Sequence, residues 1–166
     1  MLEQIVEQYG EYLYHLSYLY VKDRQLAEEI TQDVLLKFAL HKEQFRGEAA
    51  LKTYLTRIAI NCCHDELRKQ KRKALLQKLL PGRKVVPSSE QMYLQNESYS
   101  TLKECVFALP IHYREVLILH YYEEFTVHEI ADLLKLSQNT VRTRIRRARE
   151  LLKKDEELEA LFYEGV

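Results

Sequence analysis

The sequence predicts an all-α protein with two small helical domains joined by a flexible basic linker. The chain has 166 residues but only four glycines and three prolines, too few for the many tight turns of a sheet protein. Apolar residues recur at helical spacing in both halves, and no stretch alternates convincingly as a strand. Proline, glycine and serine gather instead between the halves. We therefore expect one domain at 1–72, a linker at 73–90 and a second domain at 91–166.

Three or four helices are expected in the first half. The first spans about residues 2–21 and carries an apolar stripe of Ile5, Val6, Tyr9, Leu13, Leu16 and Tyr20. Asp23 is a candidate N-cap for a second helix over 24–41. The expected buried face of that helix is Leu26, Ala27, Ile30, Val34 and Phe38. A long helix then runs from about residue 49 to 72, with Leu51, Leu55, Ile58 and Cys62 turned inward.

Four helices are expected in the second half. The first is marked by Tyr99, Leu102, Val106 and Leu109. Pro110 ends it and opens the next helix, "IHYREVLILHYYEEF". Thr126 and Glu129 have the spacing of a capping box for a short helix that ends near Lys135. Ser137 is the expected cap of the last helix, and the three-residue turn before it is typical of a helix-turn-helix.

Charge is segregated although the formal net charge is zero. Residues 69–84 hold seven bases and no acid, and residues 135–154 hold eight bases and one acid. The surrounding segments are acidic. This pattern favours two local contacts with anions and a different partner for the acidic surfaces.

The last helix, within "SQNTVRTRIRRAREL", separates an apolar stripe from a basic face. Val141, Ile145, Ala148 and Leu152 fall on one narrow arc, which is expected to be buried. The polar side offers five residues for reading base edges in a major groove: Asn139, Arg142, Thr143, Arg146 and Arg147. Arg144, Arg149 and Lys153 are expected to contact phosphates. A solvated basic helix face is the alternative.

A second polar line follows the long helix of the first half. Its members recur at helical spacing: Tyr54, Arg57, Asn61, His64 and Arg68. An aromatic ring, bases and an amide on one line, beside the loop "FRGEA", suit an unpaired nucleic-acid strand. A solvated helix face explains this line about as well.

Two segments carry a family resemblance. The run "LAEEITQDVLLKFALHKEQFRGEAALKTYLTRIAINCCHDELRKQKR" at 26–72 resembles region 2 of the extracytoplasmic-function sigma factors of bacterial RNA polymerase. The run "ALPIHYREVLILHYYEEFTVHEIADLLKLSQNTVRTRIRRAREL" at 108–151 resembles their region 4. The resemblance implies an alternative sigma factor whose first domain reads and melts the −10 promoter element and whose second domain reads the −35 element. It departs from the family at Tyr54, where tryptophan is common, and at Lys135, where glycine is common.

The resemblance also assigns residues and partners. Asn61 is expected to hold a flipped base of the −10 non-template strand, with Phe45 and Arg46 beside it. On the helix over 24–41, a strip away from the core combines acids with leucines: Glu29, Asp33, Leu36 and Leu40. By resemblance this strip binds the clamp helices of the largest polymerase subunit, and the second domain binds the flap of the other large subunit. The alternative is that the two leucines complete a local core. The family also implies an anti-sigma partner, commonly membrane-associated.

Other function classes lack their motifs. "NCCHDE" at 61–66 offers possible zinc ligands, but adjacent cysteines on a helix diverge by about 100° and no second ligand pair follows, so we expect Cys62 in the core and no metal. Neither a Gly-rich phosphate loop nor a hydrolase motif occurs, so no cofactor and no enzymatic activity are expected. Three cysteines and no apolar run of membrane-spanning length favour a cytoplasmic protein that is not itself membrane-bound. A stand-alone helix-turn-helix regulator is the rival function.

Overall fold

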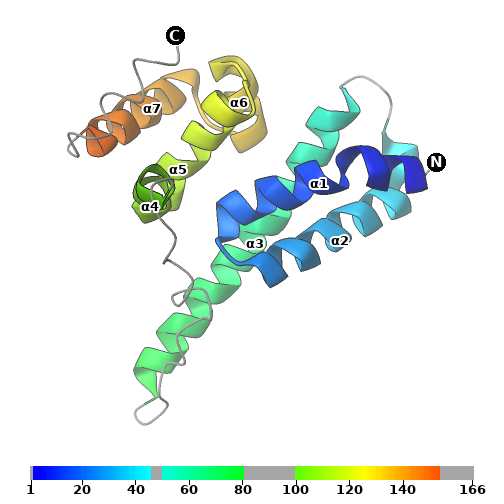
Figure 1. The fold of residues 1–166 in the computed structure, drawn as a ribbon, viewed down its shortest axis with the longest axis horizontal. Helices are drawn as coiled ribbons and strands as arrows, with labels where there is room; N and C mark the ends of the chain where they lie inside the picture. Colours follow the sequence, from blue (N-terminus) through cyan, green and yellow to red (C-terminus); the bar gives the residue numbers. More distant parts are fainter. Residues whose placement is uncertain (1, 46–49, 81–99, 154–166) are drawn as a thin grey trace. The chain divides into compact units, whose positions relative to one another are not determined.

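Helices make up all the regular structure in the described residues, 2–45, 50–80 and 100–153, of a computed structural model (Figure 1). The predicted all-α class is therefore confirmed for this part of the chain. Backbone contacts divide the chain into two compact units, Met1–Tyr93 and Leu94–Val166.

Three helices form the first unit: α1 (Leu2–Val21), α2 (Arg24–His41) and α3 (Leu51–Leu79), with a short 3₁₀ turn, η1 (Lys42–Gln44), after α2. Each of the three helices packs against the other two. Asp23 caps α2 as predicted, because its carboxylate accepts the Leu26 amide at 3.0 Å. The predicted face of α2 is buried except for Leu26, which is half-buried.

The core of this unit lies among Leu13, Leu16, Tyr20, Ile30, Val34, Leu55 and Ile60. Two predicted faces are partly wrong. Val6 on α1 is exposed, and Leu51 and Ile58 on α3 are only half-buried. The buried face of α3 is instead Leu55, Thr56, Ala59, Ile60, Cys62 and Cys63. This face is wide because α1 and α2 both pack on α3.

The predicted end of the long helix near residue 72 is wrong, because α3 continues beyond it. Residues 73–79 are helical, and the helix ends at Leu79. Alanine, leucine, glutamine and lysine in "KALLQKL" favour helix without any tertiary burial. Arg68–Asp65 and Lys69–Glu66 ion pairs one turn earlier add local support. The rest of the predicted linker, 81–90, lies outside the described residues.

The second unit contains α4 (Ser100–Ala108), α5 (Ile111–Leu117), a π-helical turn η3 (Ile118–Tyr122), α6 (Val127–Leu134) and α7 (Gln138–Leu152). One apolar cluster joins α5 and α7: Leu109, Leu117, Ala148 and Leu152, with Cys105, Val106 and Tyr113 packed against it. Arg114 donates to the carbonyls of Phe107 and Leu109, at 3.3 and 3.2 Å, and so ties the end of α4 to α5.

The helix-turn-helix forms as predicted. Thr126 and Glu129 make the full capping box, with the Thr126 amide donating to the Glu129 carboxylate at 2.8 Å and the Glu129 amide donating to the Thr126 hydroxyl at 3.2 Å. Lys135 ends α6 in the left-handed conformation, with φ 55° and ψ 46°. The Leu136 amide then donates to the Ala131 carbonyl at 2.9 Å. Ser137 caps α7 by accepting the Thr140 amide at 3.1 Å.

Lys135→Gly should raise the free energy of unfolding by about 0.5–1 kcal/mol, because glycine adopts positive φ without the steric cost of a β-carbon. Thermal unfolding of the full chain measures the change. Lys153→Gly is the matched control, since Lys153 ends α7 in the right-handed conformation and glycine there should lower stability. Stabilisation by both substitutions would contradict the strain argument.

Candidate nucleic-acid interface

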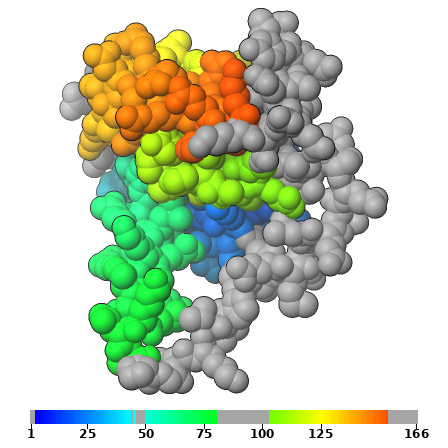
Figure 2. Space-filling model, turned by 90° about the vertical axis from the view of Figure 1, so that its left-hand side faces the viewer, coloured from blue at the N-terminus to red at the C-terminus, as the bar shows by residue number. Residues whose placement is uncertain are grey.

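Helix α7 presents the predicted polar face to solvent. All four stripe residues are buried: Val141, Ile145, Ala148 and Leu152. Among the predicted base-reading residues, Asn139, Arg142, Arg146 and Arg147 are exposed and Thr143 is half-buried. The α7 surface faces the viewer in orange in Figure 2. A single helix thus offers amide, hydroxyl and guanidinium groups along one side, as a major-groove reading helix requires.

The arginines of α7 differ in what holds them. Arg142 donates to the side chain of Gln138 at 3.2 Å, and Arg146 pairs with Glu150 at 2.6 Å along the same exposed helix side. Arg144 donates to the buried carboxylate of Glu115 on α5 at 3.4 Å. Arg144 therefore fixes α7 on α5, while Arg142 and Arg146 are oriented near solvent.

Sequence reasoning did not identify a groove beside α7. The groove has a volume of about 410 Å³ and is lined by Tyr121, Arg142, Arg146, Arg149 and Lys153, among others. Tyr121 is exposed and lies within the π-helical turn η3, a distortion that is frequent at functional sites. The consecutive tyrosines of "HYY" at the end of an apolar run were the only available signal. The groove is lined by four cations and one acid, Glu150, which pairs with Arg146, so its charge favours phosphate oxygens.

The capping box predicts an acid-sensitive helix-turn-helix. Hydrogen bonds from the Thr126 amide and then the Thr126 hydroxyl lower the pKa of Glu129. A folded pKa below the unfolded value means that the stabilisation is complete above the unfolded pKa of about 4.3 and is lost as pH falls through the folded pKa. We expect Glu129→Gln to flatten the pH dependence of unfolding between about pH 5 and 3. An unchanged acid limb in a denaturant titration would contradict this.

The polar line of the first unit lies on α3, opposite the buried face. Arg57, Asn61 and Arg68 are exposed, whereas Tyr54 and His64 are half-buried. The Tyr54 ring lies 5.3 Å from that of Phe45 and 6.2 Å from that of Phe38. Phe45 and Tyr54, predicted to act together, are therefore neighbours. Arg46 lies outside the described residues.

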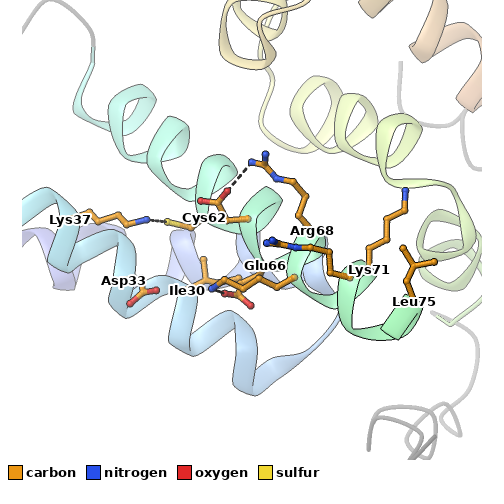
Figure 3. A pocket seen from close by; sticks show the side chains of 11 residues that line it. Ile30, Asp33, Lys37, Cys62, Glu66, Arg68, Lys71 and Leu75 are labelled. Carbon is orange, nitrogen blue, oxygen red and sulfur yellow. Dashed lines mark hydrogen bonds and ion pairs between the residues drawn. The ribbon is translucent and has the colours of Figure 1, made fainter. Parts of the chain in front are cut away.

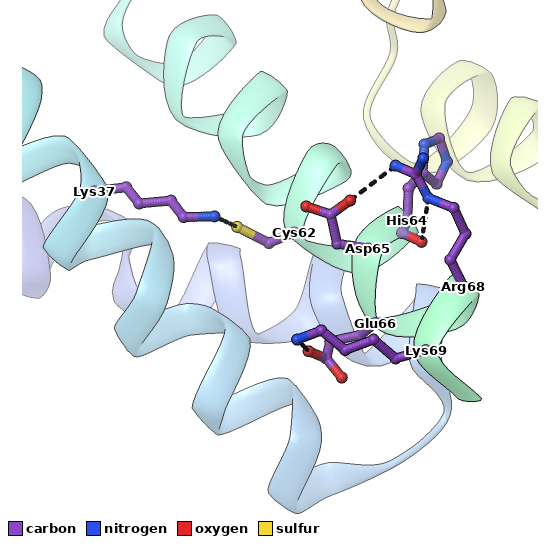
Figure 4. Close-up of polar contacts among 7 residues, drawn as sticks. All are labelled: Lys37, Cys62, His64, Asp65, Glu66, Arg68 and Lys69. Carbon is purple, nitrogen blue, oxygen red and sulfur yellow. Dashed lines mark hydrogen bonds and ion pairs between the residues drawn. The ribbon is translucent and has the colours of Figure 1, made fainter. Parts of the chain in front are cut away.

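Neighbouring groups hold part of this line (Figure 4). Arg68 pairs with Asp65 at 2.8 Å and donates to the His64 carbonyl at 3.3 Å. The His64 ring lies 6.0 Å from the Tyr20 ring, so its orientation is set by the core. Within the part of the chain that the structure describes, no hydrogen bond or ion pair engages the side chains of Arg57 and Asn61. The central amide of the line is thus available to a ligand.

The strip on α2 is exposed throughout. Leu36 and Leu40 are 58% and 70% exposed, and Glu29 and Asp33 are exposed beside them. The alternative that the two leucines complete a local core is therefore wrong. Exposed leucines between acids are typical of a protein contact.

A groove of about 570 Å³ is lined by residues of α2 and α3 (Figure 3). Two of the lining residues are hydrogen-bonded, because the Lys37 ammonium donates to the Cys62 sulfur at 3.2 Å. Burial raises the pKa of the Cys62 thiol, and burial raises that of the Cys63 thiol to about 12. Both thiols are therefore protonated core groups, as predicted for Cys62. In the described ranges no cluster of three or more His, Cys, Asp or Glu side chains is placed to hold a metal ion.

These features define a two-unit helical protein with a helix-turn-helix in its second unit. Comparison with known families gives the same division: residues 5–73 match sigma-70 region 2 and residues 100–152 match sigma-70 region 4. The RNA polymerase sigma-H factor of Pseudomonas aeruginosa is 30% identical over 171 residues, which cover 97% of this chain and 88% of that protein. The chain belongs to the sigma-70 family of RNA polymerase sigma factors, in its extracytoplasmic-function group.

Further relatives agree. SigW of Bacillus subtilis, an extracytoplasmic-function sigma factor, is 29% identical over 160 residues, covering 90% of this chain and 86% of that protein. Among solved structures, the sigma factor RpoE of Bartonella quintana, in complex with the anti-sigma factor NepR, has a similar fold with a TM-score of 0.72. That alignment is 24% identical and covers 92% of this chain and 97% of RpoE. None of the described helices is long and apolar enough to cross a bilayer.

Proposed function

We propose that this alternative sigma factor binds core RNA polymerase and directs initiation by reading the −35 element with α7 and opening the −10 element along the α3 polar line. One observation carries the proposal. The same chain presents two different exposed polar faces, an amide-centred line on α3 and a basic face on α7. The first suits an unpaired strand and the second suits a duplex groove.

The polymerase contact is assigned to the strip Glu29, Asp33, Leu36 and Leu40. Its exposed leucines need a protein partner, and its acids favour a basic one. We assign this partner as the clamp helices of the largest subunit, with the flap of the other large subunit on the second domain. Core polymerase forms the bonds of the RNA chain. The protein itself therefore acts as a cytoplasmic specificity factor and not as an enzyme.

Reconstitution tests the function directly. Sigma-free core polymerase plus the chain should initiate transcription from a specific subset of promoters in runoff assays across genomic DNA. Asn61→Ala should reduce initiation from duplex promoters while leaving core binding intact. A chain that protects specific DNA by itself, and that never gives promoter-specific initiation with core polymerase, would be a stand-alone helix-turn-helix regulator instead.

Arg146→Ala should weaken binding of the holoenzyme to its own −35 sequence by about 1–3 kcal/mol, with a much smaller loss on random DNA. The matched control is Arg149→Ala, which is assigned to phosphate and should weaken both DNAs about equally. Fluorescence anisotropy on both duplexes at fixed salt measures the ratio. If Arg146→Ala weakens binding to both DNAs equally, Arg146 contacts phosphate and does not read a base.

Control by an anti-sigma factor is part of the proposal. RpoE was solved with the anti-sigma factor NepR, and the similar CnrH was solved with the cytosolic domain of CnrY. A membrane-associated anti-sigma factor that covers the α2 strip would block polymerase binding. Co-purification of the chain with a membrane fraction, lost on mutation of Leu36 and Leu40 to glutamine, would support this control.

A further inference from the structure

Three polar contacts connect the two helices of the helix-turn-helix, and together they form what we call the polar relay. It starts on α6, where Oδ2 of Asp132 lies 3.5 Å from Nε2 of His128. Nδ1 of His128 lies 3.2 Å from Nε2 of Gln138, the first residue of α7. Oε1 of Gln138 accepts a hydrogen bond from Nη2 of Arg142 at 3.2 Å, one turn further along α7. The relay therefore connects an acid of α6 to a base-reading candidate of α7.

The donors and acceptors of the polar relay fix the protonation state of its histidine. A guanidinium group only donates, so Gln138 presents its oxygen to Arg142 and its NH₂ group to His128. Nδ1 of His128 must then accept, which places the one N–H of a neutral imidazole ring on Nε2, the side of Asp132. The neutral ring of His128 thus holds the carboxamide of Gln138 in the orientation that Arg142 requires.

This contact restricts Arg142 while leaving most of its donors open. Arg142 is exposed, and a free arginine side chain loses rotamer entropy when it binds a base. The hydrogen bond to Gln138 uses one of the five N–H donors of the guanidinium group and restricts the side chain before DNA binds. Less entropy is then lost on binding, and the remaining donors can form the two-bond pair with guanine.

Protonation of His128 disrupts the polar relay. Nδ1 then carries a proton, so it no longer accepts from the NH₂ group of Gln138. The carboxamide can offer its oxygen to the charged ring only by turning over, which brings its NH₂ group against the guanidinium group of Arg142. Two donors then face each other, and Arg142 loses its contact. Histidine is the side chain that normally gains its charge between about pH 8 and 5.

The groups around the ring include two acids and one cation. On α6 these are Asp132 and Glu129, whose pKa is lowered by the hydrogen bonds of the capping box and, to a smaller extent, by the charge of His128. On α7 they are the neutral amide of Gln138 and, beyond it, Arg142. The turn η3 also packs against α6. Among the described residues, none of the titratable side chains of η3 forms a hydrogen bond or ion pair with His128: His120, Tyr121 and Tyr122.

We propose that His128 and Gln138 are positioning residues for base reading by Arg142, and that protonation of His128 removes this positioning. The inference rests on the proposed function, because Arg142 must read a base of the −35 element. Discrimination at the base pair that Arg142 reads therefore falls as the pH is lowered. Phosphate contacts do not weaken, since protonation adds positive charge to the protein.

The test measures how strongly the holoenzyme prefers its own −35 sequence over duplexes with single base-pair substitutions, at about pH 8 and about pH 6. Arg142→Ala identifies the base pair that Arg142 reads. We expect the wild-type preference at that base pair to fall about threefold at the lower pH. His128→Ala should show the lower preference at both pH values. His128→Asn should show the higher preference at both, because its Oδ1 can accept in place of Nδ1 and does not titrate.

Two controls separate positioning from a structural role. His128 is exposed, so His128→Ala and His128→Asn should keep the wild-type unfolding temperature. In an Arg142→Ala background, His128→Ala should cause no further loss of preference, because both substitutions act on the same base contact.

Four results would overturn the proposal: a wild-type preference that does not change with pH, no effect of His128→Ala, no restoration by His128→Asn, or an equal loss at every base pair. Failure of the proposed function is distinguishable from these results. The wild-type holoenzyme would then prefer no −35 sequence at either pH.

Discussion

Leu152→Ala should remove a large part of the stability of the second unit, whereas Leu151→Ala should leave that stability nearly unchanged. Leu152 is 2% exposed and packs in the cluster that joins α5 to α7, while Leu151 is 42% exposed. A buried leucine truncated to alanine costs about 2–5 kcal/mol. A unit of this size has only about 3–8 kcal/mol of stability in total.

The same substitution at adjacent positions removes helix propensity as a variable. Amide hydrogen exchange over residues 111–152 of the full chain measures local stability, and binding to −35 duplex measures the functional consequence. We expect Leu151→Ala to change stability by less than about 0.5 kcal/mol, as is usual at surface sites. Comparable losses in the two variants would mean that α7 is not held by its apolar stripe.

Local patterns made the second unit predictable. The capping box at Thr126, the turn at Lys135 and the cap at Ser137 all act within a few residues, and the α7 stripe is strictly periodic. The structure confirms each of them because the local and tertiary preferences agree there. Lys135 adopts positive φ despite its β-carbon, so the turn is specified by its surroundings more than by that residue.

Tertiary context determined what the sequence could not show. The buried face of α3 includes Thr56, which hydropathy assigns to solvent, because its hydroxyl is hydrogen-bonded to Tyr12 at 2.6 Å and to the Lys52 carbonyl at 2.8 Å. The extension of α3 to Leu79 was missed because a nearby Pro-Gly pair outweighed good helix formers in the prediction.

At the candidate site, too, local patterns were predictable and tertiary contacts were not. Periodicity predicted which side of α7 faces solvent, and it placed Arg57 and Asn61 on an exposed line. It could not distinguish Arg144 from its neighbours, because the partner of Arg144 lies 29 residues away on α5. Nor could it show that His64 lies beside Tyr20, or that Tyr121 lines a groove with the arginines of α7.

A double-mutant cycle on Arg144 and Glu115 should give a coupling energy of about 2 kcal/mol, well above that of Arg146 and Glu150. The Glu115 side chain is only 7% exposed, so loss of the Arg144 guanidinium removes a partner that water replaces poorly. Arg146 and Glu150 are closer, at 2.6 Å against 3.4 Å, but both side chains are more than half exposed. Water screens that pair, so its coupling should stay below about 0.5 kcal/mol.

Substitution of each residue by glutamine, singly and together, supplies both cycles in one unfolding series. Each pair has its own arginine donor on α7, so burial is the main variable between the two pairs. Because Arg144 adjoins Thr143, its loss should also let α7 rotate on α5 and should lower the preference for −35 sequence over random DNA. Arg146→Gln should lower that preference without lowering stability. A stronger coupling between Arg146 and Glu150 would show that distance and not burial sets the strength of these contacts. The orientation of α7 would then depend on apolar packing alone.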